Sequence, residues 1–123
     1  MRPLVVVDAA NVVGSVPDGW WKDRAGATLR LRDKLANLGA TGIADLPPPV
    51  EVVMVVEGKA RGVPSSDTVR VVAAEGSGDD TIVDVVRTEC VGGRRCVVIT
   101  ADRGLRARVT ELGAEVLGPS TVR

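Results

Sequence analysis

Short runs of β-branched and other apolar residues recur along the chain, and segments with helical spacing of apolar residues lie between them. Such runs are typical of buried strands, and strands are expected at residues 4–7, 50–56, 68–73, 95–100 and 114–117. Helices are expected at residues 24–38, 77–91 and 102–112, and loops at residues 8–23 and 41–49. The first helix places Leu31, Leu35 and Leu38 on one face, and Gly39 follows as a stop signal.

The alternation of strands and helices predicts an α/β fold, a three-layer sandwich with a mostly parallel central sheet. The 123 residues suffice for one domain, and no internal repeat or change of composition divides them. We therefore expect a single domain over residues 1–123. Only about twelve residues join the second and third strands, which leaves the pairing of these two strands open.

The composition removes several kinds of chemistry. The chain contains no histidine, tyrosine or phenylalanine. Without histidine, the Ser-His-Asp and Cys-His nucleophile systems and the H-E-x-x-H zinc sites are excluded. The aromatic sheet surface with which RRM domains stack RNA bases is excluded as well. Sixteen basic and sixteen acidic residues cancel, so no overall field attracts polyanions, although a local basic patch is compatible with that balance.

The two cysteines and the apolar runs bear on the cellular compartment. Cys90 and Cys96 fall at a predicted helix end and a predicted strand start, which would allow a disulfide, but two buried reduced thiols are expected. The first valine run is too short for a secretory signal, and the longest uncharged apolar run, residues 52–56, is too short to span a membrane. We expect a cytoplasmic protein without a membrane segment.

Acidic residues follow three of the predicted strands. Asp8 follows the first, Glu57 the second, and Asp102 lies two residues beyond the fourth. Open parallel sheets bind ligands at the carboxyl ends of their strands, and adjacent strands are only about 4.8 Å apart. Carboxylates crowded there repel one another unless a cation neutralises them. Because the acids would form an all-oxygen ligand set, this pattern predicts Mg²⁺ or Mn²⁺.

A fourth acid, Asp79, lies at the start of the helix expected at residues 77–91. Helical spacing places Asp79 on the same face as Val83 and Val86, toward the sheet. Asp80 and Asp84 are expected on the solvated face of the same helix. The Asp79 carboxylate is therefore expected to point inward, toward the edge where the other acids meet.

The acids also have simpler interpretations, which the sequence leaves open. Asp102 could serve only as the cap of the helix that follows it, and Glu57 could be a solvated loop residue. Asp8 is harder to explain in this way, because it ends an apolar strand and the side-chain amide of Asn11 could hold its carboxylate. The prediction of a site rests on four acids arriving at one edge together.

Four segments resemble motifs of one known family. Asp8-Ala-Ala-Asn11-Val-Val-Gly14 resembles the D-G-x-N-[IV]-[IV]-G opening of the NYN/YacP-like branch of the PIN-like nucleases. Val52-Val-Met-Val-Val-Glu57 is similar to its second strand, Gly78-Asp79-Asp80-Thr-Ile82 to its A-D-[DE]-x-I helix start, and Val97-Val-Ile-Thr100-Ala-Asp102 to its V-x-[ST]-x-D strand end. Order and spacing agree over roughly residues 3 to 117, although Ala9 replaces the usual glycine and Glu57 the commoner aspartate.

This resemblance implies a sheet in the order 3-2-1-4-5 and a divalent-metal-dependent ribonuclease that hydrolyses RNA phosphodiesters. Asp8, Asp79 and Asp102 would be the catalytic acids that bind Mg²⁺ or Mn²⁺. Glu57 would be an auxiliary acid and Asn11 a supporting residue of the same catalytic set. Thr100 would support the acids and would also belong to the residues that bind the substrate.

Several cations and both tryptophans lie near the expected site and could grip RNA. Lys59 and Arg61 follow the second strand, and Arg103 follows the last acid, so all three could contact phosphates. Trp20 and Trp21 could stack on unpaired bases. They could instead form a core plug or a dimer contact.

Functions of another class are left open. The chain could be a catalytically silent PIN-like module that binds RNA, or a toxin or partner module acting with an antitoxin or an RNA-processing protein. A homodimer is left open as well. Phosphohydrolases of the D-x-D type and P-loop enzymes are disfavoured, because Ala10 stands at the second aspartate position and no G-x-x-x-x-G-K-[ST] segment occurs. Retention of all four acids favours an active nuclease over a silent module.

Overall fold

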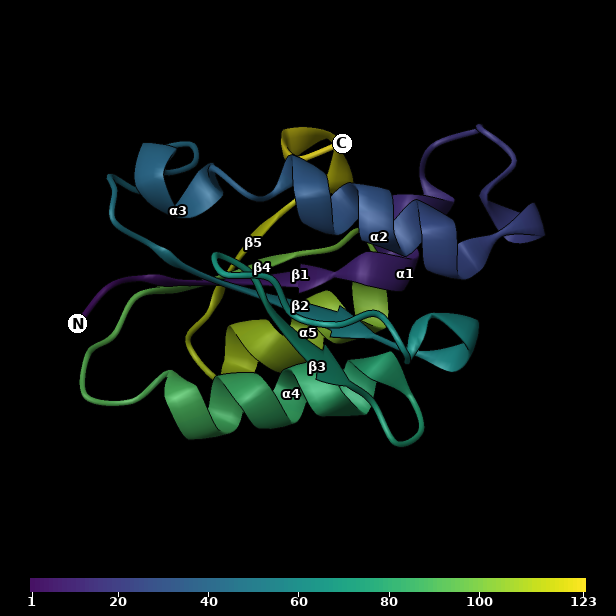
Figure 1. Ribbon diagram of the computed structural model, residues 1–123. Helices are drawn as coiled ribbons and strands as arrows, with labels where there is room; N and C mark the ends of the chain where they lie inside the picture. The colour runs from purple at the N-terminus through teal and green to yellow at the C-terminus, as the bar shows by residue number, and fades with distance from the viewer.

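Five parallel strands form the centre of the computed structural model, which describes all 123 residues (Figure 1). The strands are β1 (Leu4–Asp8), β2 (Glu51–Val56), β3 (Arg70–Ala73), β4 (Cys96–Ile99) and β5 (Glu115–Leu117). Their order in the sheet is β3-β2-β1-β4-β5, and every neighbouring pair is parallel. The predicted α/β class and the strand order 3-2-1-4-5 are confirmed, and the pairing of the second and third strands is now settled as parallel.

Helices cover both faces of this sheet, which makes three layers (Figure 1). The helices are α1 (Ala9–Gly14), α2 (Arg24–Lys34), α3 (Leu38–Thr41), α4 (Gly78–Glu89) and α5 (Arg103–Glu111), with 3₁₀ turns η1 (Trp20–Lys22), η2 (Gly58–Ala60) and η3 (Pro119–Thr121). The first three helices lie on one face, and α4 and α5 lie on the other (Figure 1). None of these helices combines the length and the apolar character needed to cross a membrane.

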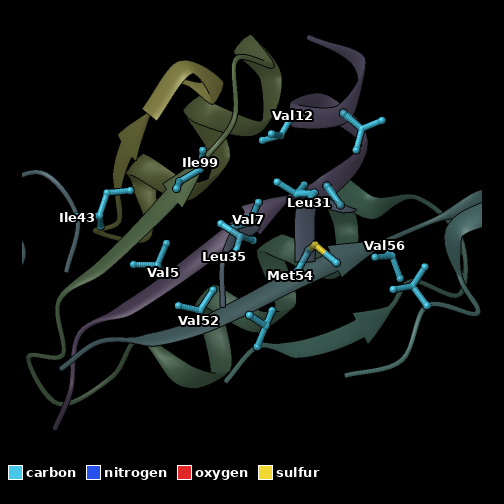
Figure 2. Close-up of a cluster of buried hydrophobic side chains, with 14 of the residues drawn as sticks. Val5, Val7, Val12, Leu31, Leu35, Ile43, Val52, Met54, Val56 and Ile99 are labelled. Atoms are coloured by element: carbon cyan, nitrogen blue, oxygen red, sulfur yellow. The ribbon is translucent and has the colours of Figure 1, made fainter. Parts of the chain in front are cut away.

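Strict alternation of side chains along the buried strands divides the core into two halves. Val5 and Val7 of β1 point into the half covered by α1 and α2, where Leu31 and Leu35 meet Met54 of β2 (Figure 2). The intervening residues of β1 belong to the other half, which is covered by α4 and α5. Because the central strands are covered on both faces, they consist almost entirely of apolar residues.

A short helix, α1, occupies part of the segment expected to be a loop. Asp8 caps it, since its carboxylate accepts a hydrogen bond from the backbone N–H of Asn11 at 3.4 Å. Val12 and Val13 are buried and attach this helix to the core. The sequence did not reveal α1 because six residues are too few to show a helical period.

Helix α2 ends earlier than expected. It spans Arg24–Lys34, whereas the prediction continued to residue 38. Leu35 already bonds to the carbonyl of Arg32, three residues back, so the last turn tightens and the chain bends. Gly39 then approaches the carbonyl of Val50 so closely that a Cβ would lie 2.9 Å from it. Gly39 is thus a point of close approach to the strand and does not stop α2.

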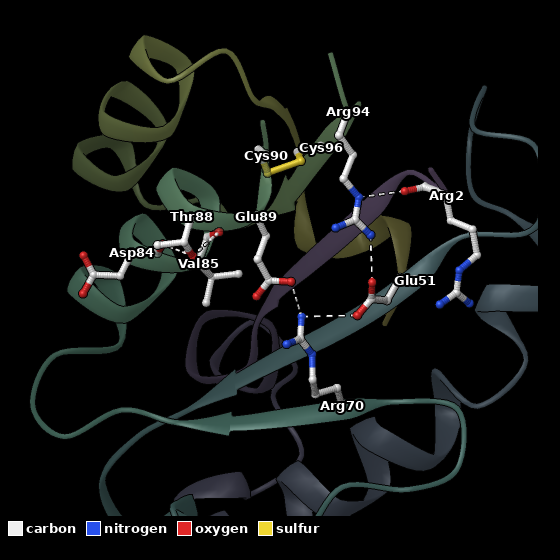
Figure 3. Close-up of a disulfide and its surroundings, with 10 residues drawn as sticks. All are labelled: Arg2, Glu51, Arg70, Asp84, Val85, Thr88, Glu89, Cys90, Arg94 and Cys96. Atoms are coloured by element: carbon white, nitrogen blue, oxygen red, sulfur yellow. Dashed lines mark hydrogen bonds and ion pairs between the residues drawn. A yellow bond between two sulfur atoms is a disulfide. The ribbon is translucent and has the colours of Figure 1, made fainter. Parts of the chain in front are cut away.

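Cys90 and Cys96 form a disulfide, which corrects the expectation of reduced thiols (Figure 3). Cys90 caps the C-terminus of α4 and Cys96 begins β4, so the turn between them brings their Cα atoms to 6.0 Å. Nearby, Glu51 at the start of β2 binds Arg94 at 2.7 Å and also pairs with Arg70, which in turn pairs with Glu89. Carboxylates at this amino edge of the sheet are therefore neutralised by arginines.

Truncating a buried side chain between α5 and the sheet is expected to destabilise the protein strongly. Leu105 is fully buried between α5 and the sheet, so Leu105→Ala should lower the free energy of unfolding by about 2 to 5 kcal/mol in urea denaturation. Leu112→Ala is the matched control, because Leu112 ends the same helix and is 37% exposed. Its effect should be below about 1 kcal/mol. Equal losses of unfolding free energy in the two variants would contradict the placement of Leu105 in the core and of Leu112 at its margin.

Candidate active site at the carboxyl edge of the sheet

The register of the three central strands brings distant polar residues to one edge. Asp8 is the last residue of β1 and lies opposite Val55, so Glu57 emerges from β2 beside it. On the other side, Val7 lies opposite Ile99, so Thr100 emerges from β4 next to Asp8. Parallel pairing thus aligns the carboxyl ends of β1, β2 and β4, where ligands bind in open α/β sheets.

Asp8 is buried at the centre of this edge. It is only 5% exposed, and its Oδ2 accepts a hydrogen bond from the hydroxyl of Thr100 at 2.8 Å. Burial raises the pKa of Asp8 to about 6, against the lowering effect of the hydrogen bonds from Thr100 and the backbone of Asn11. The charges of Asp79 and Glu57 raise this pKa further.

Thr100 and Asn11 connect the acids to one another. The Thr100 oxygen also accepts the backbone N–H of Asp102 at 3.1 Å, so one hydroxyl links two of the acidic positions. Thr100 is fully buried. It contacts these acids, as expected, but it does not face the substrate side, where it had also been expected. The Asn11 side chain accepts the N–H of Ala101 at 2.8 Å, so its backbone, and not its amide, holds Asp8.

Asp102 has the capping role that the sequence left open. Its Oδ1 accepts the backbone N–H of Leu105 at 2.8 Å and caps α5. The second oxygen, Oδ2, makes no hydrogen bond in the structure, and the side chain is exposed. Capping thus occupies one oxygen of Asp102 and leaves the other available at the shared edge.

Glu57 is attached to the start of α4 and is not a solvated loop residue. Its Oε2 accepts the backbone N–H of Gly78 at 2.9 Å. Gly78 makes this approach possible, since a Cβ there would lie 3.1 Å from the Glu57 carboxyl carbon. Ser77 caps α4 through the N–H of Asp79 at 3.1 Å. Asp79 is therefore not needed as the cap of its own helix.

The Asp79 carboxylate is half-buried and makes no hydrogen bond or ion pair. Burial raises its pKa, and the charges of Asp102 and Glu57 raise it further against the opposing charge of Arg108. Asp80 and Asp84 are exposed and pair with Arg108 and Arg87, so they form the solvated face that helical spacing predicted. The four acids at the edge thus act on one another electrostatically.

The oxygen ligands suit a hard divalent cation, but they do not form a closed cage. No three of the acidic or cysteine side chains are grouped closely enough to hold one metal ion as they stand. Mg²⁺ commonly keeps several of its waters and binds through one or two carboxylates together with substrate phosphates. Burial is the main cause of the raised pKa values of Asp8 and Asp79, and the repulsion between the carboxylates adds to it; a cation would relieve that repulsion. The residues would therefore suit a cation that keeps most of its waters, and not one enclosed by protein ligands alone.

The predicted cations flank this edge. Lys59 lies in η2 directly after Glu57, Arg61 follows that turn, and Arg103 is the first residue of α5. All three are exposed and take part in no ion pair. These side chains are therefore available for phosphate contacts. That they bind the phosphates of RNA stays a prediction.

The two tryptophans differ in environment. Trp20 is half-buried and packs against the core, whereas Trp21 is 58% exposed and meets Trp20 edge to face with ring centroids 5.9 Å apart. Sequence reasoning missed Arg24, whose guanidinium carbon lies 5.4 Å from the Trp20 ring centroid. An arginine four residues after Trp20 was the available signal. Trp20, Arg24 and Glu57 line a cavity of about 370 Å³ at this edge.

The parallel sheet in the order β3-β2-β1-β4-β5, covered by helices on both faces, defines a three-layer α/β fold. Among solved structures, the chain is similar to Rae1 (YacP) from Bacillus subtilis, with a TM-score of 0.78 and 18% identity over 98% of this chain and 71% of that one. A tryptophan-to-leucine mutant of the same protein gives a TM-score of 0.80 at 16% identity, covering 98% and 72%. Neither a protein-family model nor a curated protein matches the sequence. The likeness confirms the fold.

Buried Asp8 predicts a measurable dependence of stability on pH. Its pKa is about 6 in the folded protein, above the ordinary value of 3.8, so ionisation costs stability as the pH rises through this interval. Asp8→Asn removes that cost. Relative to wild type, the variant should gain roughly 2 to 3 kcal/mol of unfolding free energy between pH 4 and pH 7. Urea denaturation in EDTA measures this difference.

Asp84→Asn is the control for this measurement, since Asp84 is exposed at the surface of α4. The difference between this control variant and wild type should change little with pH. A constant difference between Asp8→Asn and wild type from pH 4 to pH 7 would show that Asp8 does not titrate from a buried position.

Proposed function

We propose that this chain is a divalent-metal-dependent ribonuclease that hydrolyses RNA phosphodiesters at the carboxyl edge of its sheet. The observation that carries the proposal is the gathering of Asp8, Glu57, Asp79 and Asp102 into one electrostatically coupled group. The motif resemblance to YacP-like nucleases and the likeness in fold to Rae1 (YacP) support it.

The four acids have two kinds of task in this proposal. Asp8, Asp79 and Asp102 hold Mg²⁺ or Mn²⁺, which when bound acidifies water and neutralises charge on the phosphodiester. Asp102 offers its free oxygen, because the other one caps α5. Glu57 positions the start of α4, and thereby Asp79, through its hydrogen bond to Gly78.

The remaining polar residues orient these acids and hold the RNA. Thr100 directs a hydroxyl at Asp8 while it receives the N–H of Asp102, and Asn11 ties α1 to Ala101, beside Asp102. Lys59, Arg61 and Arg103 supply exposed positive charge on either side of the acids for phosphate contacts. A cytoplasmic location, a homodimer and an antitoxin or RNA-processing partner stay predictions.

A catalytically silent RNA-binding module is the second candidate. The observation that favours it is the absence of any three acids grouped to hold an ion without rearrangement. Glu57 also favours this candidate, because it is hydrogen-bonded to Gly78 and replaces the aspartate that is commoner in the family. The two candidates differ in one measurable property, which is cleavage of RNA.

Replacing Asp79 separates catalysis from folding. The Asp79 carboxylate makes no hydrogen bond or ion pair, so Asp79→Asn should leave the fold intact. Loss of a metal ligand should lower kcat/KM for an end-labelled single-stranded RNA by at least about 100-fold in Mg²⁺ or Mn²⁺. EDTA should abolish cleavage by the wild type. Asp102→Asn should behave in the same way, because asparagine still caps α5.

Asp84→Asn provides the control on the same helix, and it should cleave at the wild-type rate because Asp84 points to solvent. Cleavage that persists in EDTA, or that is unchanged in Asp79→Asn, would refute the proposed site. RNA that the wild type binds but leaves intact in both metals would establish the silent module instead.

A further inference from the structure

We propose that the cavity beside the acidic edge receives one unpaired nucleobase of an RNA strand, with Trp20 and Arg24 in its wall. This inference rests on the proposed function, because it assigns the substrate of that same site as single-stranded. A base inside a cavity cannot remain stacked and paired in a duplex. The pocket would therefore select single strands and place a backbone phosphate near the acids.

The position of the cavity connects it to the acids. Its volume is about 370 Å³, within the range of about 300 to 1,000 Å³ that small-molecule sites occupy. Glu57 forms part of its wall, and its charge raises the pKa values of both Asp8 and Asp79. Ala9 and Ala10, which follow Asp8 directly, line it as well. A group bound there is thus next to the proposed site of cleavage.

The lining combines apolar surface with a few polar groups. Trp20 and alanine side chains supply the apolar wall, while Arg24 and Glu57 supply charge of opposite sign. Arg24 lies over the Trp20 ring, which limits the freedom of both side chains. Thr28 also lines the cavity, and its hydroxyl donates to the Arg24 carbonyl at 2.8 Å.

This chemistry matches a base better than a phosphate. The Glu57 carboxylate would repel a phosphate placed inside the cavity, where Arg24 is the single cation in the lining. A neutral base would instead pack its π-face against the wall that Trp20 and the guanidinium over it form together. Its N–H groups could donate to Glu57 Oε1, which makes no hydrogen bond in the structure. The phosphates on either side would remain outside, near the exposed cations.

The composition makes the pocket observable by fluorescence. The chain has two tryptophans and no tyrosine or phenylalanine, so Trp20 and Trp21 produce all of its aromatic emission. Trp21 is 58% exposed and does not line the cavity, so Trp21→Leu leaves Trp20 as the one reporter. In EDTA, the proposed cleavage cannot occur, and quenching of Trp20 measures binding alone.

The probes are a single-stranded oligoribonucleotide, an abasic ribose-phosphate strand of equal length, and a duplex of the same sequence. The single strand should quench Trp20 in a saturable manner. The abasic strand and the duplex should bind at least about tenfold more weakly, which corresponds to the loss of one stacked base. Equal affinity and equal quenching by all three would overturn the proposal.

A side chain that fills the cavity tests whether the nucleobase binds there. Gly76 lines it, has no positive φ, and a Cβ added there would meet no heavy atom within 4 Å. In the Trp21→Leu background, Gly76→Leu should weaken binding of the single strand about tenfold or more. Gly62→Leu is the matched control, because Gly62 is equally open and lies outside the cavity lining. Thermal unfolding of both variants checks that the fold is retained.

The outcomes separate this proposal from the proposed function. Loss of binding in Gly76→Leu but not in Gly62→Leu supports the pocket, even if the wild type cleaves no RNA in Mg²⁺ or Mn²⁺. Metal-dependent cleavage by a protein whose Gly76→Leu variant binds and cleaves like wild type would overturn the pocket and leave the nuclease standing. Weaker binding in Arg24→Ala, with Trp20 retained, would support the role of the guanidinium.

Discussion

Burial of the Asp8 carboxylate among other acids is the constraint on which the site depends. The carboxyl group ends the central strand, is almost inaccessible to solvent, and has Glu57 and Asp79 as charged neighbours. A carboxylate in that position is unfavourable when ionised, and only the hydroxyl of Thr100 and the backbone of Asn11 compensate. The protein maintains this arrangement because the sheet, with its two-sided apolar core, holds the strands in register.

Carboxylates at the two edges of the sheet differ in whether they have a positively charged partner. At the amino edge, Glu51 is paired with Arg94 and Arg70, and its hydrogen bond to Arg94 holds its pKa below the ordinary value. At the carboxyl edge, Asp79 has no such partner and its pKa is raised. Glu51 at the amino edge is neutralised within the chain, whereas Asp79 at the carboxyl edge is not, and this difference supports the proposed cation site. This contrast is the physical argument for a ligand site.

Much of the architecture could be predicted from local patterns. The valine-rich runs located all five strands, and helical spacing correctly placed Asp79 inward and Asp84 outward. The strand order came from motif resemblance, since periodicity does not show which strands are neighbours. Local patterns failed where the segments were short or bent, as in α1 and at the end of α2. There, contacts with the core and with Val50 outweighed propensity.

The sequence by itself determined the kinds of group available at the site and the strand ends from which they emerge. Alternation within a strand and spacing within a helix are local properties, and a single chain displays them directly. The tertiary structure alone decided that Cys90 and Cys96 join, that Thr100 is enclosed between two acids, and that Arg24 lies over Trp20. Those contacts depend on the three-dimensional path of loops and helix ends, because side chains pair according to distance in space and not according to separation along the chain.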